Sequence, residues 1–366
     1  MTEDAEQLIL LNPGPANTSA AVKQAMLRGD WCHREREFVD LLAALRSTLP
    51  RALGVGATHD SVLITGSGTA AMESAVLSAV RPGRALLALS NGVYGQRLAQ
   101  MAERAGIAVH LVESEWTVPM DPTDVRRALV AHPDIDAVSY VQHETTTGLV
   151  NPVRAITDVV QAERPDAITI LDAISATAAE VETMAAGGAD VIGGTANKGL
   201  HGLPGMSFLL VNGRGEDRMR AVPPRSVYLD PLGNLDAQRR GSVSFTPAVQ
   251  VCFALTAALA ELEERGGVSA RIAEYRRRAV AVRTGLRALG LVPIVDQAHR
   301  ASSVSMFPLP EGWAYDELHD ALRARGFVVY AGQGKLAERH FRVATMGELD
   351  EATIERFVAA MAATLR

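Results

Sequence analysis

The chain has 366 residues, of which 48% are apolar and 21% are charged, and its formal net charge is −6 at pH 7. This length predicts about two domains, and the composition excludes disordered, collagen-like and low-complexity chains. The negative charge argues against non-specific binding to nucleic acid.

The amino terminus and the cysteines indicate where the protein works. The first seven residues, MTEDAEQ, are acidic and polar, so they predict neither a secretory signal nor a transit peptide. The two cysteines, Cys32 and Cys252, are too few for a disulfide framework or a structural zinc site. The histidines show no metal-binding spacing of the HExxH type, so no catalytic metal is expected. We therefore expect a cytoplasmic protein.

The first two thirds of the chain alternate apolar runs with amphipathic stretches. The expected strands are residues 61–65, 85–90, 108–112, 137–141, 168–172, 191–193 and 207–211. The expected helices between them are residues 70–80, 94–105, 122–131 and 152–162. This alternation predicts an α/β fold, with a mostly parallel sheet flanked by helices on both faces. Ligands of such folds bind at the carboxyl ends of the strands.

The last third has a different pattern. Residues 241–260 carry no charge, but their polar residues make a loop followed by a buried helix more fitting than a membrane span. A helix with apolar residues at steps of three and four then ends at Gly290. Short strands near 291–295, 302–307, 327–330 and 341–345, with helices at 315–325 and 349–365, complete a smaller α+β domain. We expect a large domain over residues 1–250 and this small domain over 251–366.

The turn Gly66-Ser67-Gly68-Thr69-Ala70-Ala71 follows an expected strand and opens a helix. Its glycines let the backbone approach an anion, and the helix terminus supplies free N–H groups. The spacing also satisfies the dinucleotide pattern G-x-G-x-x-A, which requires an acidic residue about 20 positions later. Residues 86–91 contain no acid. A single phosphate therefore suits the turn better than NAD, although an NAD-dependent oxidoreductase stays open as a remote alternative.

Two further residues follow expected strands. Asp172 ends one strand and by itself is often only a helix cap. Lys198 lies just beyond another strand, and a lone lysine is usually a surface residue. Together with the glycine-rich turn they are the parts that pyridoxal phosphate needs: a phosphate anchor, an acid for the pyridine nitrogen and a lysine that bonds the aldehyde.

The motifs then resemble those of class V aminotransferases of fold type I, in the branch that acts on 2-aminoethylphosphonate. Six segments carry the resemblance in family order over almost the whole chain. They are Leu11-Asn12-Pro13-Gly14-Pro15, Gly66-Ser67-Gly68-Thr69, Asn91-Gly92-Val93-Tyr94-Gly95, His143-Glu144-Thr145-Thr146-Thr147-Gly148, Ala196-Asn197-Lys198 and Phe341-Arg342-Val343-Ala344-Thr345-Met346-Gly347. The Glu-Thr-Thr-Thr-Gly segment (144–148) and the Ala-Asn-Lys segment (196–198) are the more specific ones.

The resemblance implies a role for each matching residue. Lys198 would bond the cofactor and then carry the proton between substrate and cofactor, while Asp172 would hold the pyridinium. Tyr94 would stack on the cofactor ring. The remaining cofactor contacts would come from Ser67, Gly68, Thr69, Thr145, Thr195, Asn197 and Thr246.

Other matches concern the substrate and the assembly. Arg342 would bind the substrate carboxylate with its planar fork, and Gly14 and Pro15, within an amino-terminal segment (1–20) that reaches the site, would close over the substrate. Thr246 matches a phosphate contact that comes from the neighbouring subunit in relatives. The resemblance therefore implies a homodimer with shared active sites.

The implied reaction moves the amino group of 2-aminoethylphosphonate, or a close aminophosphonate, to pyruvate and gives phosphonoacetaldehyde and alanine. Residues 31–38 and the Ala176-Thr177 pair depart from the pattern, which leaves the amino donor open. An alanine/serine–glyoxylate-type aminotransferase or a pyridoxal-phosphate-dependent lyase on a related amine are the alternatives. No nucleic-acid or membrane partner is expected.

Overall fold

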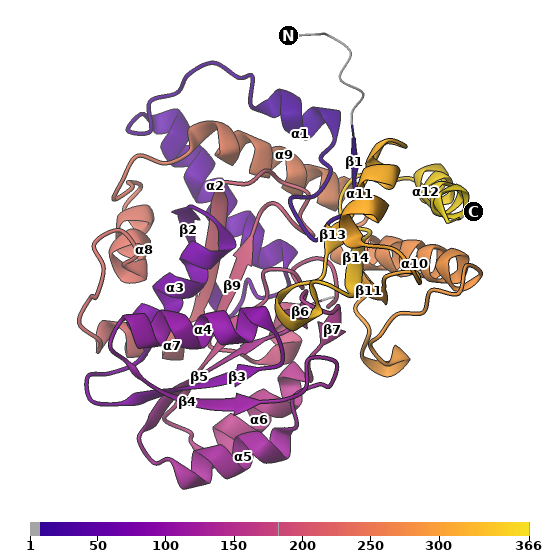
Figure 1. Cartoon of the computed structure of the whole chain (residues 1–366). Helices are drawn as coiled ribbons and strands as arrows, with labels where there is room; N and C mark the ends of the chain where they lie inside the picture. Colours follow the sequence, from indigo (N-terminus) through magenta and orange to yellow (C-terminus); the bar gives the residue numbers. More distant parts are fainter. Residues whose placement is uncertain (1–7, 182, 366) are drawn as a thin grey trace.

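A computed structural model describes residues 8–181 and 183–365, and its centre is a seven-stranded sheet in the order β2-β10-β9-β8-β5-β3-β4 (Figure 1). The pairs from β9 to β4 are parallel, whereas β10 is antiparallel to both β9 and β2. The strands are β2 (His59–Thr65), β3 (Ala85–Ser90), β4 (Ala108–Glu113), β5 (Ile135–Val141), β8 (Ile168–Asp172), β9 (Val191–Thr195) and β10 (Met206–Asn212). The predicted mostly parallel sheet is confirmed.

Helices cover both faces of this sheet. Side chains of β3, β5, β8 and β9 are all buried, as expected for strands covered on both sides. Two separate apolar clusters fill the two interfaces. One cluster draws on α2 (Arg36–Ala52), α5 (Pro122–Ala131), α6 (Val153–Glu163) and α9 (Val249–Glu264); the other draws on α3 (Gly68–Ala79), α4 (Val93–Arg104), α7 (Gly213–Arg220) and α8 (Pro231–Arg239).

The carboxyl-terminal part forms its own antiparallel sheet, β11-β14-β13. Its elements are α10 (Gly267–Arg287), β11 (Val304–Pro308), α11 (Tyr315–Arg323), β12 (Phe327–Val328), β13 (Tyr330–Ala331), β14 (His340–Ala344) and α12 (Glu351–Thr364). The short amino-terminal strand β1 (Ile9–Leu10) pairs in parallel with β12, so the amino-terminal segment packs against the carboxyl-terminal part (Figure 1). Short α1 (Ala20–Ala25) packs on α9. The boundary at residues 250 and 251 stays a prediction.

Two expectations for this region had opposite outcomes. The uncharged stretch 241–260 is a loop followed by the largely buried α9, as predicted. The prediction of a strand near residues 291–295 was wrong. Only the Ile294 N–H reaches a neighbouring strand, at 3.1 Å from the Met306 carbonyl, and Pro293 has no N–H to donate.

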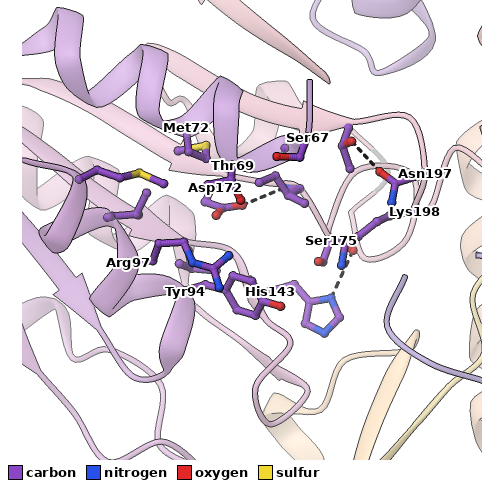
Figure 2. Close-up of a pocket in the computed structure, with 16 residues that line it drawn as sticks. Ser67, Thr69, Met72, Tyr94, Arg97, His143, Asp172, Ser175, Asn197 and Lys198 are labelled. Carbon is purple, nitrogen blue, oxygen red and sulfur yellow. Dashed lines mark hydrogen bonds between the residues drawn. The ribbon is translucent and has the colours of Figure 1, made fainter. Parts of the chain in front are cut away.

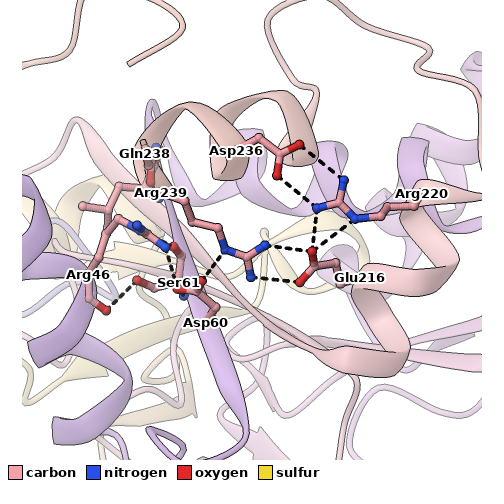
Figure 3. Close-up of polar contacts among 9 residues, drawn as sticks. Arg46, Asp60, Ser61, Glu216, Arg220, Asp236, Gln238 and Arg239 are labelled. Carbon is pink, nitrogen blue, oxygen red and sulfur yellow. Dashed lines mark hydrogen bonds and ion pairs between the residues drawn. The ribbon is translucent and has the colours of Figure 1, made fainter. Parts of the chain in front are cut away.

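An ion-pair network ties α2 and β2 to α7 and α8 (Figure 3). Arg239 pairs with Asp60 at 2.9 Å and with Glu216 at 2.8 Å, and Arg220 pairs with the same Glu216 at 2.6 Å. The hydrogen bonds from Arg239 and Arg220 lower the pKa of Glu216 to about 2. Such surface pairs contribute modestly one by one, and more when they are linked.

No helix in the two described stretches combines the length and the apolar character that crossing a membrane would need.

Candidate active site

A cavity of about 180 Å³ opens at the carboxyl ends of β8 and β9, where α3 and α4 begin (Figure 2). It is several times larger than the ~30 Å³ share of one water molecule. Its polar lining residues are Ser67, Thr69, Tyr94, Arg97, His143, Asp172, Ser175, Thr195, Asn197 and Lys198. This is the edge of the sheet at which an α/β fold is expected to bind its ligand.

The amino terminus of α3 forms one wall. Ser67 is the N-cap residue, yet its side chain makes no capping hydrogen bond, so the hydroxyl is available to a ligand. A side chain at Gly68 would place its first carbon 2.7 Å from Ile174 Cδ1, so any larger residue would displace the Ile174 side chain. Free N–H groups, two hydroxyls at Ser67 and Thr69 and the positive end of a helix suit an anion such as phosphate.

Asp172 lies at the end of β8 and is buried. Its Oδ1 accepts a hydrogen bond from the Ile174 N–H at 3.0 Å. Burial raises the pKa of Asp172 to about 6, because the charged carboxylate is poorly solvated there. A cationic ligand group beside Asp172 would restore its ordinary acidity.

Lys198 lies three residues beyond β9, in the same cavity. Its Nζ donates a hydrogen bond to the Pro13 carbonyl oxygen, and a side chain at Gly14 would come within 3.2 Å of that Nζ. Burial lowers the pKa of Lys198, although Tyr94 and Asp172 oppose this shift. A lysine with a lowered pKa holds more neutral, nucleophilic amine.

Lys198 also stands out by elimination. The chain contains three lysines, against 33 arginines. Lys23 is exposed on α1, and Lys335 is exposed and pairs with Glu115 at 3.2 Å. Lys198 is therefore the lysine that can reach a ligand in this cavity.

The other predicted contacts on β9 and α4 also reach the cavity. Thr195 Oγ1 donates to Asn197 Oδ1 at 2.7 Å, which fixes the turn that carries Lys198. Tyr94 lies in the first turn of α4 and borders the cavity, as its expected stacking role requires. The guanidinium of Arg97 lies 4.8 Å from the centre of the Tyr94 ring.

Glu144, in the short strand β6 (His143–Glu144), explains how the Tyr94 segment is held. This fully buried carboxylate accepts hydrogen bonds from the Tyr94 N–H at 3.2 Å and the Gly95 N–H at 3.3 Å. A side chain at Gly92 would collide with Glu144. Glu144 thus caps α4 from a distant strand, and the Asn-Gly-Val-Tyr-Gly and Glu-Thr-Thr-Thr-Gly motifs depend on each other.

Some predicted residues do not line the cavity. Arg342, on β14, is buried and donates from Nη1 to the Thr145 carbonyl oxygen and to Gln333 Oε1, both at 3.0 Å. The Thr145 hydroxyl is buried and has no partner among the described residues. Pro15 accepts a hydrogen bond from Asn12 Nδ2 at 3.1 Å, and Ala16 N–H reaches the Asn197 carbonyl at 3.2 Å. Residues 1–7 of the expected amino-terminal segment lie outside the described residues.

Thr246 lies elsewhere in the same subunit. It borders two other hollows, one with Thr65, Tyr228 and Phe245 and one with His33 and Arg34. It is absent from the lining of the cavity around Lys198.

Some site residues have roles that the sequence did not reveal. His143 and Arg97 line the cavity, and Glu144 supports it. His143 was visible only as part of a motif, and Arg97 as one of many arginines, so neither pattern singled out its side chain.

Away from the cavity, three side chains of types that can bind a metal lie close together. They are His110 on β4 and, just after α5, His132 and Asp134. His110 Nε2 is 3.1 Å from both carboxylate oxygens of Asp134, and His132 stacks on His110 with ring centres 3.8 Å apart and an interplanar angle of 19°. One ion cannot lie in the planes of two rings stacked in this way. The observed arrangement is a hydrogen-bonded pair with a stacked neighbour.

The cavity fits pyridoxal phosphate. The free hydroxyl of Ser67 at the start of α3 suits the phosphate, and the raised pKa of Asp172 marks a carboxyl that awaits a cation such as a pyridinium. His143 Nε2 is buried without a partner among the described residues, as expected of a group that contacts a ligand. Lys198 supplies the amine.

Comparison with known proteins agrees with this chemistry. The family description "Aminotransferase class-V" matches residues 19–347. A protein of Syntrophobacter fumaroxidans named 2-aminoethylphosphonate–pyruvate transaminase is 35% identical over 356 residues, which cover 96% of this chain and 95% of that protein. A protein of Vibrio vulnificus with the same name is 33% identical and covers 97% of both chains.

Solved structures extend the likeness to the fold. An aspartate aminotransferase from Thermus thermophilus superposes with a TM-score of 0.89 at 26% identity, covering 97% of this chain and 98% of that one. An alanine–glyoxylate aminotransferase from Nostoc sp. superposes with a TM-score of 0.94 at 23% identity, covering 100% and 97%. The expected fold type I architecture is confirmed.

Proposed function

The chain belongs to the class V aminotransferases, and from that premise we propose that it transfers the amino group of 2-aminoethylphosphonate to pyruvate, giving phosphonoacetaldehyde and alanine. It is a transaminase that depends on pyridoxal phosphate. The observation that carries the proposal is one cavity in which a lysine, a buried aspartate and a helix terminus meet. Relatives named for this reaction match almost the whole chain and support the choice of substrates.

Each side chain has a distinct task in the proposed mechanism. Ser67, Gly68 and Thr69 would bind the phosphate of the cofactor, Tyr94 would stack on its ring, and Asp172 would keep its ring nitrogen protonated. When bound, the cofactor supplies an electron sink that stabilises negative charge on the substrate carbon. The Lys198 Nζ would take the proton from that substrate carbon and carry it to the cofactor.

Other residues shape the space around that proton transfer. Gly14 lies against Lys198, so the amino-terminal segment excludes water from the amine. Thr195 and Asn197 hold the Lys198 turn, and we assign Thr145 a hydrogen bond to the cofactor's ring hydroxyl. Cys252 is buried, which raises its pKa to about 12 and makes it unfit as the nucleophile of a desulfurase.

A spectroscopic titration tests the proposed reaction. The chain is loaded with pyridoxal phosphate, and its visible absorbance is followed as 2-aminoethylphosphonate is added. We expect the band of the lysine-bound cofactor to disappear and pyruvate to restore it. If only amino acids bleach the band, or if glyoxylate alone restores it, the proposed substrates are wrong and an alanine/serine–glyoxylate-type reaction takes their place.

Arg342 is proposed to bind the carboxylate of pyruvate. Arg342→Gln removes a charge-assisted contact worth about 1.5–3 kcal/mol, so the KM for pyruvate should rise roughly 10–100-fold. Steady-state kinetics with both substrates measure the change. Arg339, which is exposed beside the same strand, provides the control: Arg339→Gln should leave the KM for pyruvate unchanged. An unaltered KM in Arg342→Gln would assign the carboxylate to another residue.

We further propose a cytoplasmic homodimer in which Thr246 completes the phosphate site of the partner. Two aromatic side chains that border the same hollow as Thr246 are exposed in the single subunit, Tyr228 at 42% and Phe245 at 38%, and they would be covered by a second copy. The distance of Thr246 from the Lys198 cavity in its own subunit is consistent with this arrangement.

Mixing two inactive variants tests the shared site. Lys198→Ala and Thr246→Asp subunits are each expected to be inactive as homodimers. In a mixed dimer, one site combines an intact Lys198 with an intact Thr246 from the other subunit, so exchange of equal amounts should restore about a quarter of the wild-type activity. Tandem purification over two different affinity tags, one on each variant, confirms that mixed dimers form, and size-exclusion chromatography with light scattering confirms the dimeric mass. Mixed dimers without activity would show that Thr246 serves its own subunit.

A further inference from the structure

His143 has a buried ring nitrogen without a hydrogen-bond partner beside the active-site cavity. The side chain is 2% exposed and lines the cavity together with Lys198, Tyr94 and Asp172 (Figure 2). Its Nε2 has no hydrogen-bond partner among the described residues. A buried polar atom without a partner is costly, so it calls for a partner such as a water molecule, an ion or a ligand.

The hydrogen-bond partner of Nδ1 determines which ring nitrogen of His143 carries the proton. Nδ1 lies 3.3 Å from the Ser175 carbonyl oxygen, which can only accept a hydrogen bond. Nδ1 must therefore be the donor. Burial lowers the pKa of His143, with the Lys198 cation acting in the same direction and Glu180 opposing it. The ring is neutral at pH 7, and Nε2 offers a lone pair as a hydrogen-bond acceptor.

The surroundings fix the ring in this orientation. Glu180 Oε1 lies 3.7 Å from His143 Nδ1. Glu180 is itself held, because its carboxylate accepts hydrogen bonds from the Ser302 N–H at 2.7 Å and the Ser303 N–H at 2.9 Å. The imidazole thus lies beside the Ser175 carbonyl and the Glu180 carboxylate, and hydrogen bonds hold this carboxylate in place.

The nearest cation does not satisfy Nε2. The Lys198 Nζ donates to the Pro13 carbonyl instead. The remaining charged groups of the cavity are Asp172, an acceptor, and Arg97, whose guanidinium lies over Tyr94. The lone pair of Nε2 is left for a donor that arrives with a ligand.

We propose that His143, as the neutral Nδ1–H tautomer, is a substrate- or cofactor-contacting residue whose Nε2 accepts a hydrogen bond from a bound donor. This inference rests on the proposed function, which supplies two such donors: the ring hydroxyl of the cofactor and the amino group of the incoming amine. Both present the same chemistry, an O–H or N–H group directed at a neutral acceptor. His143 would then help to position the ligand without exchanging its own proton.

Nitrogen NMR of the chain labelled at histidine tests the tautomer and the contact. The chain has nine histidines, and His143→Gln identifies the signals of residue 143. In the unloaded chain we expect Nε2 to be unprotonated and Nδ1 protonated. Addition of pyridoxal phosphate alone should shift the Nε2 signal if the ring hydroxyl is the donor. A shift that appears only after 2-aminoethylphosphonate is added identifies the amine.

Cofactor affinity gives a second readout. His143→Leu replaces the imidazole with an apolar side chain of similar bulk that has no hydrogen-bond acceptor. It should weaken ligand binding about tenfold, as the loss of one hydrogen bond predicts. His143→Gln, which can still accept, should bind within about threefold of the wild type. Binding of pyridoxal phosphate to the unloaded chain, measured by fluorescence quenching, applies if the cofactor is the donor; the apparent affinity for the amine applies otherwise.

The outcomes separate this inference from the proposed function. A protonated Nε2 in the unloaded chain, or an Nε2 signal that neither ligand moves, overturns the role of His143 even if the transamination titration succeeds. A chain that binds the cofactor and shifts the Nε2 signal, but is not bleached by 2-aminoethylphosphonate, supports His143 and refutes the proposed amine. A chain that does not bind the cofactor overturns both.

Discussion

Replacing Lys198 with alanine is expected to lower kcat at least about 10⁴-fold, because the variant loses both the nucleophile that bonds the cofactor and the base that moves the proton. The visible band of the lysine-bound cofactor should be absent from the purified variant. Lys198→Arg keeps a positive charge but not a nucleophilic amine, so it should be equally inactive. Absorbance spectra and single-turnover kinetics measure both effects.

The scarcity of lysine allows a direct test of the attachment site. Borohydride reduction of the loaded chain fixes the cofactor on its lysine, and peptide mapping then has three candidates to distinguish. We expect the label on Lys198 and none on Lys23 or Lys335, which are exposed. Lys335→Ala serves as the matched control and should retain wild-type activity. Label on Lys335, or a coloured Lys198→Ala variant, would contradict the assignment.

The central sheet was predictable because of its burial on both faces. The strand β8 coincides with its prediction, and β5 and β9 extend theirs by two residues. The continuous apolar runs of such strands, set between amphipathic helices, leave few alternatives. The antiparallel β10 was a different case. Its residues are as apolar as those of its neighbours, so the sequence carries no indication of its direction.

Elements that depend on tertiary contacts were less visible. Helix α2 was not predicted, because it contains Pro50, and a proline is normally expected to end a helix. Pro50 lacks the N–H that would reach the Arg46 carbonyl, and this carbonyl instead accepts a hydrogen bond from Ser61 Oγ at 2.8 Å. The pairing of β1 with β12 joins residues more than 300 positions apart, and two-residue strands have no periodicity to detect.

The site shows the same division. Asp172 and Lys198 were recognisable because each follows a buried strand, and parallel strands bring their carboxyl ends together. The role of Glu144 in holding the start of α4 was not recognisable. Its partners are the backbone N–H groups of Tyr94 and Gly95, and any sequence supplies such groups. The acceptor lone pair of His143 likewise depends on the Ser175 carbonyl beside it.

Asp172→Asn is expected to separate catalysis from stability. An amide cannot keep the cofactor's ring nitrogen protonated by charge, so kcat should fall about 10²–10³-fold, the usual cost of losing one preorganised electrostatic group. Rapid-quench kinetics of the half-reaction with 2-aminoethylphosphonate measure this loss. Asp172→Glu, which keeps the charge but moves it, provides the comparison, and it should retain more activity than the amide.

The unloaded variant should nevertheless be more stable than the wild type at neutral pH. The pKa of Asp172 is raised from 3.8 to about 6 in the folded chain, so between these values the folded state holds a proton that the unfolded state releases. Unfolding free energy therefore falls as pH rises through this window, by up to about 3 kcal/mol in total. Asparagine removes that dependence.

Denaturant unfolding of the unloaded wild type and Asp172→Asn at pH 5 and pH 8 tests the sign. The stability advantage of the variant should grow between these pH values, because the amide has no charge to bury. Loading with pyridoxal phosphate should reverse the order, because a pyridinium beside the carboxylate compensates its burial only in the wild type. A variant that is less stable at pH 8 without cofactor would show that Asp172 is stabilised by the fold itself, and that it does not await a cationic ligand.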